Sequence, residues 1–147
     1  MGPIKVGVYK MIQWFPGHMA KAKQGIIDKL SLVDIVFELI DARVPLSSRN
    51  PMIDEIIKNK PRLILMTKSE MSDPSLNKSF INYFEGQGSH ILSIDAFKNF
   101  NKNRIYNKTR EVLQEKILKD QARGLKTRPI RAMIIGIPNV GKSTLIN

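Results

Sequence analysis

The most informative segment of the chain is Arg131-Ala-Met-Ile-Ile-Gly-Ile-Pro-Asn-Val-Gly-Lys-Ser-Thr144. It opens with a short apolar segment typical of a buried strand, and from Gly136 onward it matches the phosphate-loop pattern G-x-x-x-x-G-K-[ST]. Glycines at 136 and 141 let the backbone turn tightly, so that successive N–H groups hold phosphate oxygens at a helix N-terminus. We therefore predict a nucleotide site here.

The side chains of this loop suit the same chemistry. Lys142 supplies a point charge for the β and γ phosphates, and Ser143 offers a hydroxyl to Mg²⁺. The alternative is a chance glycine-rich turn, because the pattern also arises by accident. The strand before the loop and the lack of a helix breaker from Gly141 to Asn147 favour the nucleotide site.

The composition of the 147 residues fits one domain of ordinary size, with 42% apolar and 25% charged residues. The chain has no cysteine and two histidines, so we expect no disulfide and no metal cluster. This composition fits a reducing, cytoplasmic setting. No apolar run approaches the roughly 18 residues that a membrane span needs, so we expect no membrane partner.

The net charge of +11 is spread unevenly along the chain. Residues 98–131 hold eleven Lys or Arg against three acidic residues, and residues 1–29 hold five against one, whereas residues 30–97 hold seven against nine. Two basic segments around a near-neutral middle indicate a polyanionic partner such as RNA. A lysine-rich solvated helix would give the same count, so both interpretations stay open.

Strand-like and helix-like segments follow one another along the chain. Strands are expected over 35–40, 62–66, 90–94 and 131–135. Helices are expected over about 18–30, 51–60, 74–85 and 105–123, because Asn50-Pro51 and Asp73-Pro74 are good helix starts and Gly124 is a good helix end. Residues 1–10 are expected to form a disordered leader, and residues 97–104 a loop.

This alternation predicts an α/β fold, mainly a parallel sheet with helices on both faces. Ligands of such sheets bind beyond the carboxyl ends of the strands. The polar segments at 41, 67, 93–96 and 136 should therefore share one rim of the sheet.

The turn Thr67-Lys68-Ser69-Glu70 follows the second expected strand and could read a nucleotide base. In GTPases an Asn-Lys-x-Asp turn does so, since its carboxylate accepts hydrogen bonds from guanine N1–H and the 2-amino group, which adenine lacks. A charge-assisted hydrogen bond contributes roughly 1.5 to 3 kcal/mol, so Glu70 should matter most for selectivity. The alternative is an exposed strand-to-helix turn. Backbone N–H groups of Ser93, Ile94 and Asp95 would support the base similarly.

The base-reading turn precedes the phosphate loop, whereas ordinary GTPases have the phosphate loop first. Together with the motifs at 13–22 (Gln-Trp-Phe-Pro-Gly-His-Met-Ala-Lys-Ala), 41–43 (Asp-Ala-Arg), 47–51 (Ser-Ser-Arg-Asn-Pro) and 136–144, this order resembles the circularly permuted GTPases of the ribosome biogenesis GTPase A type. The resemblance covers Met11 to Asn147 and leaves out the leader. It implies a circularly permuted P-loop GTPase fold over residues 11–147.

The resemblance also implies an activity: GTP binding and hydrolysis to GDP in the cytoplasm, coupled to late maturation of the large (50S) ribosomal subunit. The partners would be the precursor of that subunit and its rRNA. On this basis His18 is the catalytic residue that orients the attacking water. The residues expected to hold phosphates and Mg²⁺ are Asn139, Val140, Gly141, Lys142, Ser143 and Thr144, with Ser143 on Mg²⁺ and Asn139 on a K⁺ ion as in potassium-activated relatives.

The chain departs from the family after the phosphate loop. The family continues with a switch threonine, an Asp-x-x-Gly turn and a C-terminal helical RNA-binding domain, and only six residues follow Gly141 here. We therefore expect a truncated chain that by itself is not a competent GTPase. Two alternatives stay open: an RNA-binding module with a vestigial nucleotide site, and a P-loop ATPase or kinase.

Overall fold

The computed structural model describes residues 4–5, 12–13, 19–43, 51–57, 59–67, 73–94, 101–125 and 129–136. Six strands and five helices lie within these ranges. The strands are β1 (Ile4–Lys5), β2 (Ile12–Gln13), β3 (Ile35–Asp41), β4 (Arg62–Thr67), β5 (His90–Ser93) and β6 (Ile130–Gly136). The helices are α1 (Met19–Leu30), α2 (Pro51–Ile56), α3 (Pro74–Gly86), α4 (Asn101–Val112) and α5 (Gln114–Ala122).

The described strands form one sheet in the order β1-β6-β3-β4-β5, and β2 also pairs with β6. All of these pairings are parallel. The four strands expected from the sequence are present, each within one residue of the expected bounds. Parallel neighbours require crossover connections, which the helices supply, so the predicted parallel α/β fold is confirmed.

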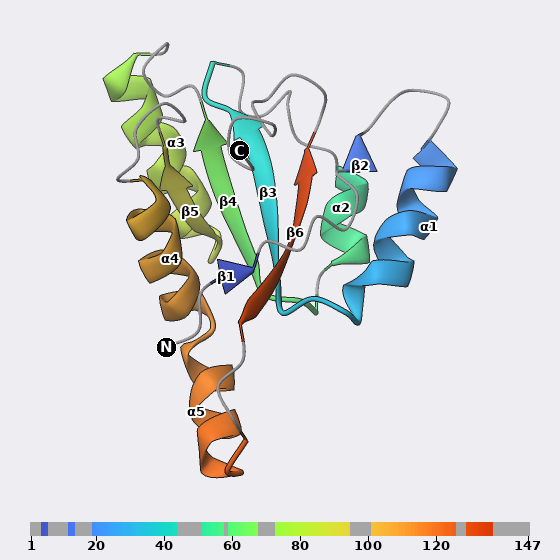
Figure 1. The fold of residues 1–147 in the computed structure, drawn as a ribbon. Helices are drawn as coiled ribbons and strands as arrows, with labels where there is room; N and C mark the ends of the chain where they lie inside the picture. Colours follow the sequence, from blue (N-terminus) through green and yellow to red (C-terminus); the bar gives the residue numbers. More distant parts are fainter. Residues whose placement is uncertain are drawn as a thin grey trace.

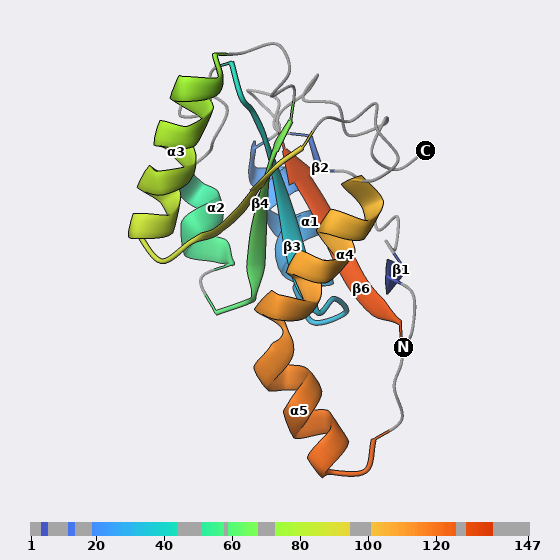
Figure 2. The same cartoon turned by 90° about the vertical axis from the view of Figure 1, so that its left-hand side faces the viewer.

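Helices cover both faces of the sheet (Figure 1; Figure 2). Side chains alternate along β3, so that Phe37 and Leu39 pack toward α4, whereas Val36 packs toward α1 and α2 and Ile40 toward α3. All seven residues of β3 are buried, as expected for a central parallel strand covered on both sides. The hydrophobic core therefore forms two layers, one on each side of the sheet.

Buried charges interrupt this apolar strand at one position. Glu38 lies in the middle of β3 and its side chain is only 2% exposed. Arg62, at the start of β4, places a guanidinium nitrogen 3.2 Å from the Glu38 carboxylate and also pairs with Asp54 of α2. A buried carboxylate needs such a partner because desolvation penalises its charged form. This network joins β3, β4 and α2.

Local sequence signals account for both ends of α3. Asp73 is the N-cap, and its carboxylate accepts a hydrogen bond of 2.8 Å from the backbone N–H of Ser75, with Pro74 at the first helical position. Beyond the other end, Gly88 has a φ of 81° and its N–H donates to the carbonyl of Glu85. Glycine adopts this left-handed conformation without strain, so the chain can turn directly into β5.

The single helix expected over 105–123 was wrong in two respects. The structure has two helices, α4 and α5, which meet at Leu113, and α4 already begins at Asn101 within the expected loop 97–104. Leu113 is 2% exposed and packs in the core beneath α4, which fixes the chain at the point where the two helices meet. The Thr109 hydroxyl donates to the Ile105 carbonyl at 2.7 Å, an interaction that often bends helices.

The N-terminal leader expected over 1–10 lies mostly outside the described residues. Within it, Ile4 and Lys5 form β1 and pair in parallel with Ile130 and Arg131 of β6. The sequence offered no partner signal for these two residues, because a two-residue strand is defined by its neighbour rather than by its own pattern. For the rest of 1–10, disorder stays a prediction.

Replacing Arg62 by Met should lower the free energy of unfolding by about 2 to 3 kcal/mol, because it removes a cation from the buried Glu38 carboxylate. Urea unfolding measures this loss. The double variant Glu38→Gln with Arg62→Met should lose less than the sum of the two single variants.

The matched control for Arg62→Met is Lys78→Met, which replaces an exposed cation of α3. It should change stability by no more than about 0.5 kcal/mol. Equal losses in the two variants would contradict a stabilising role for the Glu38–Arg62 pair.

Candidate functional site

The carboxyl ends of the four central strands meet at one edge of the sheet (Figure 1). Asp41 pairs with Thr67, Met66 with Ser93, and Leu39 with Gly136. The strands therefore end within about two residues of one another along the register. This is the rim at which ligands bind in open parallel sheets, and it is the rim predicted from the sequence.

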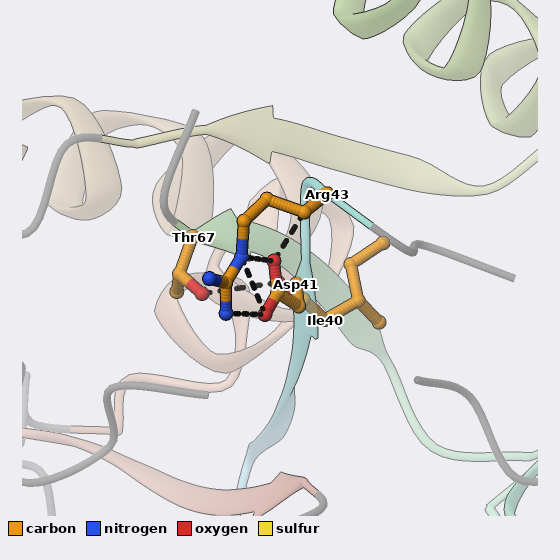
Figure 3. A network of polar contacts seen from close by, with 4 residues as sticks. All are labelled: Ile40, Asp41, Arg43 and Thr67. Atoms are coloured by element: carbon orange, nitrogen blue, oxygen red, sulfur yellow. Dashed lines mark hydrogen bonds and ion pairs between the residues drawn. The ribbon is translucent and has the colours of Figure 1, made fainter. Parts of the chain in front are cut away.

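An ion pair between Asp41 and Arg43 marks the end of β3 (Figure 3). The Arg43 Nη2 donates to Asp41 Oδ2 at 2.7 Å, and its Nε donates to Oδ1 at 3.0 Å. The backbone N–H of Arg43 also donates to Asp41 Oδ1 at 2.9 Å. The Asp41 side chain is 7% exposed and that of Arg43 is 48% exposed. The pair thus fixes a buried carboxylate beneath a guanidinium that faces outward.

The same contact changes the electrostatics of Arg43. The hydrogen bond to Asp41, followed by the negative charge of that carboxylate, raises the pKa of Arg43 above its ordinary value. The guanidinium therefore stays charged at any physiological pH. The sequence identified Asp41-Ala-Arg43 as one of the motifs of the family resemblance, but it did not predict the ion pair between the two side chains. An acid and an arginine two residues apart after a buried strand were the available signal for this pair.

Thr67 ties the end of β4 to the end of β3 (Figure 3). Its hydroxyl donates to the Ile40 carbonyl at 3.1 Å, and its own carbonyl accepts the Ala42 N–H at 2.8 Å. The Thr67 side chain is buried. The first residue of the predicted base-reading turn is therefore held by two hydrogen bonds from the neighbouring strand.

Ser93 ends β5 on the same rim, and Ile94 follows it directly. The backbone N–H of Ile94 already takes part in a hydrogen bond within the sheet. The Ile94 N–H donates to the Met66 carbonyl at 2.9 Å, and the Ile94 side chain packs in the core on the α4 side. This N–H therefore extends the sheet. Because the Ile94 N–H is already engaged in this bond, the structure argues against its predicted hydrogen bond to a base.

The other predicted site residues lie outside the described residues, and their roles stay predictions. They are His18, Lys68, Ser69, Glu70, Asp95, Asn139, Val140, Gly141, Lys142, Ser143 and Thr144. The described elements nevertheless give the points at which these segments begin. Residues 68–70 leave the end of β4, Asp95 follows Ile94, and residues 137–144 leave the end of β6.

The start of the His18 segment is located by β2. Gln13 pairs with Gly136, the first residue of the phosphate-loop pattern, and Ile12 pairs with Ile135. Four residues separate Gln13 from His18, and α1 begins at Met19. The described backbone therefore places Gln13, five positions before His18 in the sequence, beside the first residue of the phosphate-loop pattern, more than a hundred residues away in the chain.

Two further observations apply only to the part of the chain that the structure describes. It contains no group of three or more acidic, histidine or cysteine side chains arranged to hold a metal ion. None of its helices is long and apolar enough to cross a membrane.

Comparison of the sequence with known proteins finds close relatives. The chain is 56% identical over 137 residues to ribosome biogenesis GTPase A of Priestia megaterium, covering 92% of this chain and 48% of that protein. It is 54% identical to ribosome biogenesis GTPase A of Bacillus pumilus, with 92% and 48% covered. Mitochondrial ribosome-associated GTPase 1 of Mus musculus is 35% identical, with 95% and 42% covered. The chain thus spans about half the length of these relatives, and no family model matches it.

Solved structures show the same fold. The crystal structure of GNP-bound YlqF from T. maritima matches with a TM-score of 0.62 at 31% identity, covering 86% of this chain and 46% of that one. GDP-bound YlqF matches with a TM-score of 0.59 at 30% identity, covering 83% and 45%. The first of these structures is bound to GNP and the second to GDP.

Replacing Thr67 by Val should loosen the contact between the ends of β3 and β4, because it removes the hydroxyl that bonds to the Ile40 carbonyl. One such bond contributes about 1 kcal/mol, so the Ala42 amide, which bonds to Thr67, should exchange with solvent about fivefold faster. Hydrogen exchange followed by NMR measures this rate.

Thr109→Val is the matched control, since it removes a similarly buried hydroxyl that bonds to the carbonyl of Ile105 within α4. It should leave local exchange at Ala42 unchanged, apart from any loss of global stability. A rate that rises equally in both variants would show that Thr67 has no special role at the rim.

Proposed function

This chain belongs to the ribosome biogenesis GTPase A family over the half of the relatives' length that it spans, and on that premise we propose that the protein binds GTP and hydrolyses it to GDP during maturation of the large ribosomal subunit. The relatives are named for ribosome biogenesis and for GTPase activity. Because the chain spans about half of them, the activity is proposed for the whole protein that contains it.

The observation that carries this proposal is the strand order at the rim. β6, which leads into the phosphate-loop sequence, and β4, which leads into Thr67-Lys-Ser-Glu70, lie on either side of β3. Neighbouring strands are about 4.8 Å apart, so the two segments begin about 10 Å apart, a separation that one nucleotide bridges from base to phosphates. The sheet therefore offers a phosphate end and a base end to the same ligand.

At the phosphate end we assign Asn139, Val140, Gly141, Lys142, Ser143 and Thr144. Backbone N–H groups and the Lys142 ammonium suit phosphate oxygens, and a hydroxyl such as that of Ser143 is a hard oxygen ligand that Mg²⁺ accepts beside phosphates. Mg²⁺ would neutralise charge on the β and γ phosphates. The side-chain oxygen of Asn139 is likewise a suitable ligand for a K⁺ ion near the phosphates.

At the base end we assign the turn Thr67 to Glu70, with Ser93 to Asp95 beside it. Thr67 positions the turn through its two bonds to the end of β3. The Glu70 carboxylate then accepts hydrogen bonds from guanine, and Lys68 and Ser69 complete the turn. Ile94 supports this end by fixing β5 against β4.

His18 is the residue that we assign to orienting the attacking water. The pairing of Gln13 with Gly136 supports this role, because Gln13 is only five positions before His18 in the sequence and Gly136 begins the phosphate-loop pattern. The chain spans about half the length of its relatives. Hydrolysis is therefore assigned to the whole protein.

The partners that we propose are the precursor of the large ribosomal subunit and its rRNA, in the cytoplasm. The relatives named for ribosome biogenesis or ribosome association support this choice. The net charge of +11 supports it independently, because a polyanionic partner releases counterions when it binds a basic surface.

Replacing Lys142 by Ala should abolish measurable GDP binding, because the phosphates lose their only side-chain cation in the loop sequence. Titration with a fluorescent GDP measures this. The affinity for RNA should stay unchanged. Lys78→Ala, an exposed lysine of α3, is the control and should bind GDP normally.

Two outcomes of this experiment would count against the proposal. Unaltered GDP binding by Lys142→Ala would remove the phosphate loop from the site. Wild-type protein that binds RNA but no nucleotide would favour an RNA-binding module with a vestigial site.

Replacing Glu70 by Ala should weaken GDP binding about 10- to 100-fold and erase the preference for GTP over ATP, because guanine loses a charge-assisted acceptor. Competition of labelled GDP by unlabelled GTP or ATP measures the preference. Glu85→Ala, at an exposed position of α3, is the control. Equal competition by ATP in the wild type would identify a P-loop ATPase instead.

A further inference from the structure

Helix α5 extends beyond the end of the sheet opposite the nucleotide rim (Figure 1; Figure 2). None of its residues is buried, and Leu118 is 56% exposed. A nine-residue helix is not stable by itself in water, so its attachment and its exposed surface need an explanation.

A row of cations follows one side of this helix. Lys116, Lys119 and Arg123 have the spacing i, i+3, i+7, which places them along about 10 Å of the helix axis on neighbouring turns. All three line a surface hollow of about 390 Å³, together with Pro61 at the start of β4. Two acidic residues, Glu115 and Asp120, also line it.

The inner end of this row is held in place by the sheet. Lys116 pairs with Asp34, whose carboxylate is 8% exposed and also accepts the Arg131 N–H at 2.9 Å. Close by, Lys60 donates from Nζ to the Val33 carbonyl at 2.8 Å. Both ammonium groups are therefore fixed before any ligand binds.

The electrostatics show that these two lysines act on one another. Burial lowers the pKa of Lys60, the positive charge of Lys116 lowers it further, and Asp34 opposes this effect. A lysine whose charged form is disfavoured by a neighbouring cation gains from an added anion. The junction of Lys60 and Lys116 thus favours a negatively charged ligand.

The outer end of the row is exposed and available. Among the described residues, Lys119 and Arg123 take part in no ion pair, and both are exposed. Residues 101–125 hold seven Lys or Arg against three acidic residues. About half of the charge excess of residues 98–131 therefore lies between Asn101 and Leu125, the range that contains α4 and α5.

The character of the hollow distinguishes between two kinds of partner. The core of a protein–protein interface is depleted in charged residues and rich in aromatic and apolar ones. This hollow is lined mainly by charged side chains, with Pro61, Val112 and Leu113 as its apolar part. Interfaces with nucleic acid are more polar and more positively charged; three cations and two acidic residues line this hollow, and Lys60 adds a cation close by.

We propose that a group of four cations binds phosphates of an RNA backbone. This group, which we call the basic face of α5, consists of Lys116 and Lys119 of α5, Arg123 at the end of the helix, and Lys60, which precedes β4. The proposal rests on the proposed function for the ribosomal source of that RNA. Because this face lies at the opposite end of β3 from Asp41, RNA and nucleotide bind without competing. The short segment after α5 leads into β6, so the RNA contact is continuous in sequence with the strand that precedes the phosphate loop.

The test compares two double variants of the full-length protein that contains this chain. Lys119→Gln with Arg123→Gln removes the two exposed cations of the basic face. Lys23→Gln with Lys78→Gln removes two exposed cations from α1 and α3 and is the matched control. The probe is a labelled hairpin of large-subunit rRNA, titrated at several salt concentrations.

The first variant should bind the hairpin about tenfold more weakly, and its slope of log K against log salt should fall by about 1.5, as expected for two lost phosphate contacts. The control should keep the wild-type affinity and slope. Equal losses of RNA affinity in both variants would show that only the net charge of the protein matters, and would overturn the proposal. The proposal would also be overturned if Lys119→Gln with Arg123→Gln kept the wild-type RNA affinity and salt slope. Loss of binding to an acidic ribosomal protein, with RNA binding unchanged, would instead identify a protein as the partner.

GDP titration of the same variants separates this proposal from the proposed function. The basic-face variant should bind GDP like the wild type, whereas Lys142→Ala should lose GDP and keep its RNA slope. The wild type could fail to bind GDP while Lys119→Gln with Arg123→Gln still weakens RNA binding. That result would contradict the proposed function and support the RNA-docking surface.

Discussion

The parallel pairing of β3 with β4 on one side and β6 on the other is the constraint on which the rest of the structure depends. The register brings Asp41 beside Thr67 and Leu39 beside Gly136, so three segments distant in sequence end at one rim. A shift of one residue would send the side chains of a strand to the opposite face. Such a shift would carry Glu38 of β3 away from Arg62 of β4, so their pairing helps to fix the register and with it the rim.

Within the described residues, the buried carboxylates in and next to this sheet each have a specific partner. Glu38 is matched by Arg62, Asp41 by Arg43, and Asp34 by Lys116 and the Arg131 N–H. Breaking a buried pair leaves an uncompensated charge, which is costly. Each pair also joins separate elements or rigidifies a strand end, and two of the three lie at the ends of β3.

The two ends of β3 suggest a division of work. The carboxyl end faces the proposed nucleotide site, and the amino end carries Asp34, which anchors Lys116 beneath the basic face of α5. β6 connects the two ends, since it follows the segment after α5 and ends at Gly136, where the phosphate loop begins. The relatives are about twice as long as the part of them that this chain matches.

The sequence by itself determined the four central strands, the helix starts at Pro51 and Pro74 and the parallel sheet, because strand periodicity, capping and alternation of elements are local signals. It also placed Thr67, Ser93, Ile94 and Gly136 at the strand ends. Only the tertiary structure decided that the segment 101–122 divides at Leu113, that Ile4 pairs with Ile130, and that Gln13 lies beside Gly136. Only in the tertiary structure does the Ile94 N–H bond to the Met66 carbonyl, and only there does Lys116 pair with Asp34, 82 residues away in the sequence. These outcomes depend on which surfaces meet in space, and contacts between distant segments leave no periodic pattern in the chain.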